Sequence, residues 1–111
     1  MQTEFRRKAP RRPYDGSVGV LFRGTMHFIP CLQVGEGGAL LSRTPELSEI
    51  QQGDTLVLTI FFPKIGGVVA TAECVYVSDE ENIGLSFQQL SMDFKKKIRE
   101  FVSRRKSVEA A

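Results

Sequence analysis

The sequence has little of several residue types on which common functional sites depend. It contains two cysteines, one histidine and no tryptophan in 111 residues. Cys31 and Cys74 stand far apart in apolar stretches, without the paired spacing of a zinc site, so we expect two buried free thiols. His27 has no second histidine with which to share a metal ion, and we expect an ordinary, partly exposed strand residue there. These absences argue against a metal centre.

The sequence also lacks a long apolar segment. Its longest uncharged apolar run, Thr55 to Pro63, is far shorter than the roughly 20 residues that a membrane-spanning helix needs. The chain does not open with a basic segment followed by an apolar stretch, which a secretory signal would require. We therefore expect a cytoplasmic protein of one domain, without a transmembrane segment.

A catalytic constellation is missing as well. A Ser-His-Asp triad would need His27, and nothing near it has the form of a nucleophile elbow. The glycine-rich stretch 35–38 opens onto an apolar segment and is followed by no Gly-Lys-Ser/Thr, so it matches neither a phosphate-binding loop nor a dinucleotide fingerprint. The acids of the polar connection 45–54 are expected to be solvated. We expect no enzyme activity.

What the sequence does have is an uneven distribution of charge behind its net +2. Residues 1–12 hold five bases against one acid, which gives +4, and residues 91–111 hold seven bases against three acids, again +4. Residues 13–90 hold three bases against nine acids, which gives −6. Basic ends around an acidic body indicate an anionic ligand or partner, although solvated termini would have the same composition.

Most of the chain has the pattern of short strands, rich in β-branched and aromatic residues and separated by turn signals. The predicted strands are 17–22, 26–34, 38–43, 55–62, 68–78 and 83–90. The connection 45–54 contains proline and glycine and has room for one helical turn. Six short strands at this spacing predict a closed barrel or a sandwich, and closure has the advantage of removing exposed sheet edges.

The period of the apolar residues changes near the end of the chain. Phe94, Ile98, Phe101 and Val102 follow the i, i+4, i+7, i+8 spacing of one helical face. Ser91 is placed to cap the N-terminus of this helix. We expect the apolar face to cover one side of the barrel.

The order of these segments, from about Arg6 to Val102, resembles the PilZ domain family. The family signature begins with R-x-x-x-R, which is present as Arg7 to Arg11, with Arg6 and Arg12 on either side. The resemblance implies a six-stranded antiparallel β-barrel with a C-terminal α-helix. It also implies a receptor for the bacterial messenger cyclic di-GMP. On this basis we divide the chain into a flexible basic arm (1–12), a barrel with its helix (13–106) and a disordered tail (107–111).

The second half of the family signature, D/N-x-S-x-x-G, is altered in this chain. Gln33 stands for the acid or its amide, Gly35 stands for the serine, and Gly38 matches the final glycine. Gln33 keeps an amide oxygen that can accept a hydrogen bond from guanine, whereas Gly35 has no hydroxyl group. Losing both contacts would weaken binding by about 2–4 kcal/mol, or roughly 30- to 1,000-fold.

Two hypotheses follow from the resemblance. In the first, the protein binds cyclic di-GMP and passes the signal to an unidentified protein partner, with no other cofactor. Arginine suits this ligand because its fork can bind phosphate oxygens or the edge of guanine. The implied ligand-binding residues are Arg7, Arg11, Gln33, Gly35 and Gly38, with Arg6 and Arg12 as possible additions. In the second, the protein is a degenerate adaptor that binds other proteins but not the nucleotide.

A third hypothesis, a barrel that binds nucleic acid, is disfavoured by the sequence. Surfaces that bind single strands interleave basic residues with exposed aromatic rings on which the bases stack. The body of this chain is acidic, and we expect its strand aromatics to be committed to packing. These aromatics are Phe61, Phe62, Tyr76 and Phe87.

Overall fold

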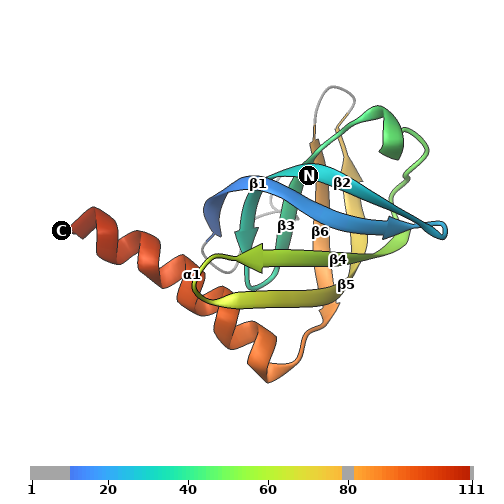
Figure 1. Ribbon diagram of the computed structural model, residues 1–111. Coiled ribbons are helices and arrows are strands. Elements are labelled where there is room, and N and C mark those ends of the chain that lie inside the picture. The colour runs from blue at the N-terminus through green and yellow to red at the C-terminus, as the bar shows by residue number, and fades with distance from the viewer. Residues whose placement is uncertain (1–10, 79–81, 111) are drawn as a thin grey trace.

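The computed structural model describes residues 11–78 and 82–110, which form a closed antiparallel barrel and one helix (Figure 1). The strands are β1 (Arg11–Phe22), β2 (Thr25–Gly35), β3 (Gly38–Ser42), β4 (Thr55–Phe62), β5 (Gly66–Val77) and β6 (Asn82–Gln89). A short 3-10 helix, η2 (Pro45–Leu47), precedes β4, and α1 (Met92–Ala110) follows β6. The order around the barrel is β1-β2-β3-β6-β5-β4, closed by pairing of β1 with β4. The predicted six-stranded barrel with a C-terminal helix is confirmed.

The core of the barrel follows from the alternation of side chains along each strand. In β4, Leu56, Leu58, Ile60 and Phe62 are buried, and the residues between them point outward. Phe61 is one of these outward residues and is 62% exposed, so the prediction that it is committed to packing is wrong. Ile60 and Phe62 point into the barrel, and because side chains alternate along a strand, Phe61 between them must point outward.

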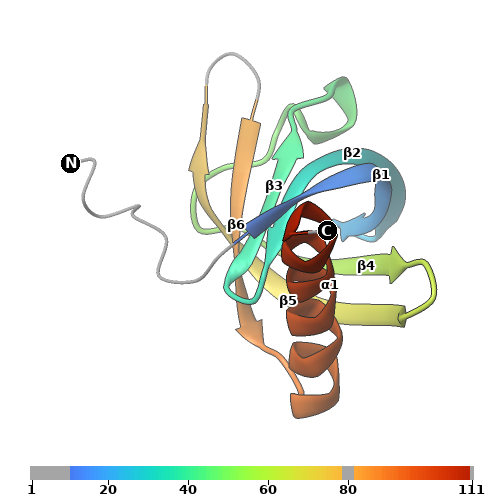
Figure 2. The same ribbon diagram turned by 90° about the vertical axis from the view of Figure 1, so that its left-hand side faces the viewer.

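Helix α1 closes one end of the barrel (Figure 2). Ile98 is fully buried, and the Phe101 ring lies 4.6 Å from the Phe62 ring, measured between centroids. Ser91 Oγ accepts a hydrogen bond from the backbone N–H of Phe94 at 3.1 Å, which confirms the predicted N-cap. The helix continues to Ala110, so residues 107–110, expected to form a tail, are helical.

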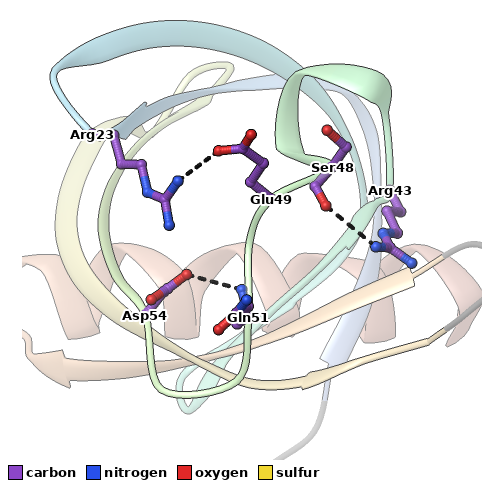
Figure 3. Close-up of polar contacts among 6 residues, drawn as sticks. All are labelled: Arg23, Arg43, Ser48, Glu49, Gln51 and Asp54. Atoms are coloured by element: carbon purple, nitrogen blue, oxygen red, sulfur yellow. Dashed lines mark hydrogen bonds and ion pairs between the residues drawn. The ribbon is translucent and has the colours of Figure 1, made fainter.

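The connection 44–54 closes the opposite end, and Leu47 and Ile50 are its buried residues. Figure 3 shows the polar contacts that hold it. Arg23, in the β1–β2 turn, pairs with Glu49 at 2.7 Å, and Arg43 donates to the carbonyl oxygen of Ser48 at 3.4 Å. Asp54 accepts a hydrogen bond from the backbone N–H of Gln51 at 2.9 Å. Asp54 and Glu49 therefore have structural contacts within this connection.

The two cysteines are free and buried, as predicted. Burial raises the pKa of Cys31 to about 12, and burial likewise raises the pKa of Cys74. Because the thiolate is the reactive form, both side chains act as small apolar groups of the core. His27 is a half-buried residue of β2, in agreement with its prediction as a strand residue.

Candidate functional site

The two halves of the predicted signature meet at the first residues of β1. Arg11 is paired with Gly35, and Pro13 with Gln33, in the antiparallel ladder of β1 and β2. Arg11 and Arg12 are therefore residues of strand β1. They are also the last two residues of the segment 1–12 that we expected to be a flexible arm. Arg6 and Arg7 lie outside the described residues. The structure thus joins Arg11 to the altered motif, although the two are more than twenty positions apart in the sequence.

Irregularities in the ladders shape this part of the barrel. The β1–β2 register shifts between Pro13 and Gly16, and the β2–β3 register shifts between Cys31 and Gln33. Such bulges bend a strand and change the direction in which a side chain points. Gln33 is half-buried next to this shift, and its carbonyl oxygen accepts a hydrogen bond from Cys31 Sγ at 3.5 Å.

Gly38 has a structural reason to be glycine. The residue is buried where β3 pairs with β6, opposite Ser86. A Cβ atom at this position would collide with the backbone carbonyl oxygen of Leu85. The match of Gly38 to the last position of the signature is thus explained by the close approach of two strands, independently of any ligand.

Glu36, in the turn between β2 and β3, is bound to the helix. Its carboxylate accepts two hydrogen bonds from the Arg99 guanidinium, at 2.7 Å from Nε and 3.2 Å from Nη2. The pKa of Glu36 is lowered, mainly by this hydrogen-bonded contact, and the same contact raises the pKa of Arg99. The pair cannot be predicted from a local pattern, because the two residues are 63 positions apart and neither belongs to a short motif.

Arg12 is the second link between the site and the helix. Its Nη1 donates to the carbonyl oxygen of Phe101 at 2.9 Å, and its guanidinium lies over the Phe101 ring, 4.3 Å from the centroid. Tyr14, two residues later, packs its ring edge against Phe62 and donates its hydroxyl hydrogen to the carbonyl oxygen of Phe61 at 2.6 Å. Arg12 thus ties β1 to α1.

An open groove of about 590 Å³ adjoins the β2–β3 turn. It is lined by Glu36, the end of β6 and the segment that enters α1, including Phe87, Gln88, Ser91 and Lys95. Its volume falls within the range of small-molecule sites, and its lining combines one aromatic ring with amide and charged groups. The groove extends the polar region around Glu36 toward the helix.

Two kinds of feature are absent from residues 11–78 and 82–110, a cluster of possible metal ligands and a helix that could span a membrane. This part of the chain holds no group of three or more histidine, cysteine, aspartate or glutamate residues that could bind a metal ion. None of its helices has the length and apolar character needed to cross a membrane.

Comparison with known proteins gives one family. Residues 5–104 match the sequence model of the PilZ domain. The fold is similar to that of the Bacillus subtilis inhibitor of motility MotI/DgrA, with a TM-score of 0.84 at 16% identity, over 96% of this chain and 54% of that one. The PilZ domain of Escherichia coli YcgR with c-di-GMP gives a TM-score of 0.75 at 13% identity, over 95% of this chain and 96% of that one.

The complex of K. pneumonia MrkH with c-di-GMP gives a TM-score of 0.71 at 19% identity, over 95% of this chain and 53% of that one. The chain thus spans about half the length of the MotI/DgrA and MrkH structures. No curated protein sequence matches it.

Proposed function

Because the chain belongs to the PilZ domain family, we propose that it is a cytoplasmic receptor that binds cyclic di-GMP and passes the signal to a protein partner. The ligand is held between Arg7 and Arg11 on one side and the segment from Gln33 to Gly38 on the other. The observation that carries this proposal is the pairing of Arg11 with Gly35, which brings the second arginine of R-x-x-x-R next to the altered half of the signature.

The chemistry of the ligand suits these residues. Two phosphates and two guanines offer the arginine forks several bidentate partners, and the guanidinium planes can stack on the bases. Arg7 would reach the ligand from the segment that precedes β1, and fixing its side chain on the ligand costs conformational entropy that the charged contacts must exceed. Gln33 supplies an amide oxygen, and Gly35 supplies backbone groups only.

The contacts of α1 suggest how binding would be transmitted. The helix is tied to one half of the site through Arg12 and to the other through Glu36. A ligand that attracts Arg12 or displaces Glu36 would change a hydrogen bond between the site and α1. Among the described elements, α1 is the only helix of more than one turn. We propose that the partner detects this change.

A second candidate function is supported by the altered motif itself. Gly35 has no hydroxyl group, and Gln33 is half-buried beside a register shift. If these changes abolish nucleotide binding, the protein is an adaptor that acts through protein contacts alone.

Isothermal titration with cyclic di-GMP separates the two functions. The receptor binds with a low-micromolar dissociation constant, and the double variant Arg7→Ala, Arg11→Ala weakens binding by roughly 30-fold or more. The matched control is Arg23→Ala, Lys64→Ala, which removes the same charge from two turns and leaves binding within about twofold. Absence of heat at about 50 µM ligand would reject the receptor and support the adaptor.

A further inference from the structure

One face of the barrel carries an exposed apolar surface for which the proposed receptor has no use. It is formed by the outward side chains of β2, β1, β4 and β5, and we call it the apolar face. Its members are Leu21, Met26, Phe28, Phe61 and Val69. Phe28 is 76% exposed and Phe61 is 62% exposed. Among the described residues, the other exposed large apolar side chains are Leu32, next to the register shift of β2 and β3, and Met92, on α1.

Strand register shows that these side chains are neighbours. Leu21 is paired with Met26 on one side and with Val57 on the other. One row along, Gly19 lies between Phe28 and Thr59, and Thr59 is paired with Val69. The apolar face is therefore continuous over adjacent strands rather than a scatter of single residues, and continuous exposed patches mark interaction sites.

The centre of the apolar face lacks charge, and a carboxylate stands only at its rim, where Glu73 of β5 is paired with Thr55. The outward positions between the bulge of β1 and the β1–β2 turn, and from Val57 and Thr71 to the β4–β5 turn, are apolar, glycine, serine or threonine. They are Ser17, Gly19, Leu21, Met26, Phe28, Pro30, Val57, Thr59, Phe61, Gly67, Val69 and Thr71. A surface for nucleic acid would interleave basic residues with such rings, so this one does not fit a single strand. A strongly charged partner likewise gains no ion pair here.

Neither closing element of the barrel covers this face. Figure 1 shows β1, β4 and β5 side by side, with α1 next to the β4–β5 turn and the η2 segment toward the other end. Lys97 of α1 reaches only the edge of the face, where it donates to the carbonyl oxygen of Gly67 at 3.2 Å. The exposure of Phe28 and Phe61 shows that the described chain leaves the centre open.

We propose that the apolar face is the contact surface of a homodimer, in which the same face of a second copy packs against it. Charge favours this occupant. Residues 13–90 carry −6, which disfavours contact between the acidic parts of two copies, whereas the uncharged centre of this face brings no like charges together. A two-fold contact also requires a self-complementary surface, with projections and hollows on the same copy.

The apolar face has both the projecting side chains and the hollows that a self-complementary surface needs. Each exposed phenylalanine stands beside a glycine of the next strand, Phe28 beside Gly19 and Phe61 beside Gly67. The sulfur of Met26 leans toward Gly19, only 3.3 Å from where a Cβ would stand. Methionine is flexible, so it can move aside when a ring from the second copy enters.

The size of the face sets the expected strength. Four strands about 4.8 Å apart, with about six residues each at about 3.4 Å, give a face of roughly 400 Å² before side-chain relief is counted. Two such faces bury about 800 Å² or somewhat more, which is below the roughly 1,200 Å² of stable complexes and in the range of weak, transient contacts. We therefore expect a reversible dimer with a dissociation constant on the order of 10–100 µM.

Sedimentation equilibrium of the full chain, from about 1 µM to about 1 mM and without nucleotide, tests the proposal. The wild-type protein should shift from monomer to dimer in this range. Phe28→Asp and Phe61→Asp should each raise the dissociation constant more than about tenfold, because each buries an unpaired carboxylate in the contact. Met92→Asp is the matched control, since Met92 is as exposed as Phe61, at 62%, but lies on α1; it should change the constant less than about twofold.

Circular dichroism of each variant verifies that it is folded, which is expected because all three side chains are exposed. A wild-type protein that stays monomeric to about 1 mM overturns the proposal and leaves the face to a different protein. Dimerisation that Phe28→Asp and Phe61→Asp leave unchanged overturns it as well, because the contact then lies elsewhere. Neither result depends on whether cyclic di-GMP binds.

Discussion

Strands β1 and β2 have two halves with opposite characters. The half that holds Arg11 and Gln33 is bulged, carries arginine and is tied to α1 by hydrogen bonds. The half that holds Leu21 and Phe28 is regular, uncharged and open to solvent. In the first half, position and charge decide what can bind; in the second, apolar area does. Under the two proposals, one pair of strands serves a small anionic ligand at one end and a protein surface at the other.

The largest effect should come from a change that damages both halves together. Gly38→Ala places a Cβ atom against the carbonyl oxygen of Leu85, and separating β3 from β6 opens the closed barrel. We expect the free energy of unfolding to fall by about 3 kcal/mol or more, measured by urea denaturation. Gly37→Ala is the control, because nothing lies within 4 Å of its added Cβ. Equal stability of the two variants would contradict the close approach of β3 and β6.

The second largest effect should come from a change that alters nucleotide binding at one half and leaves the apolar face at the other half untouched. The double variant Gln33→Asp, Gly35→Ser restores the family signature and should tighten cyclic di-GMP binding by roughly 30-fold, measured by titration calorimetry. Dimerisation should stay unchanged, because neither residue belongs to the apolar face. Weaker binding in this variant would show that the altered motif is adapted to the ligand in its present form.

The smallest effect concerns the ion pair of Glu36 with Arg99. The pKa of Glu36 is lowered in the folded state, so its contribution to stability is present above the ordinary glutamate value of about 4.3 and is lost as the pH falls through the lowered pKa. The variant Glu36→Gln should thus be less stable than the wild type at pH 7 and equally stable in strong acid, by thermal unfolding. The pair is exposed to solvent, so the difference should be far below that of Gly38→Ala.

The control for this pH experiment is Glu100→Gln, which removes the helical pair with Arg104 and leaves the β2–β3 turn untouched. A difference between Glu36→Gln and the wild type that persists unchanged below pH 3 would contradict the ionic origin of the effect.

The sequence predicts the barrel well because its strands obey a simple alternation. Leu56, Leu58 and Ile60 share one face by spacing alone, and the turn residues between segments divide the chain into strands. Spacing also places Phe61 on the opposite face, but it does not reveal whether another element covers that face. This is why the exposure of Phe61 had to come from the structure.

The candidate site is less accessible from the sequence. A motif identifies Arg11 and Gly35 separately, whereas their pairing depends on how β1 and β2 align. The contact of Glu36 with Arg99 depends on the helix returning to the β2–β3 turn, which no local pattern encodes. The start of β1 at Arg11 was missed because its neighbours are basic and proline-rich, a composition typical of a solvated arm.

The crowding around Gly38 has a consequence for the evolution of such domains. A lineage that stopped using the nucleotide would be free to replace Gln33 or Gly35, but selection for a folded barrel would still retain Gly38. The final glycine of the signature would then outlast the activity with which it is associated. Among related sequences, its presence therefore reports an intact barrel, whereas under the proposed function the residues at positions 33 and 35 report the ligand.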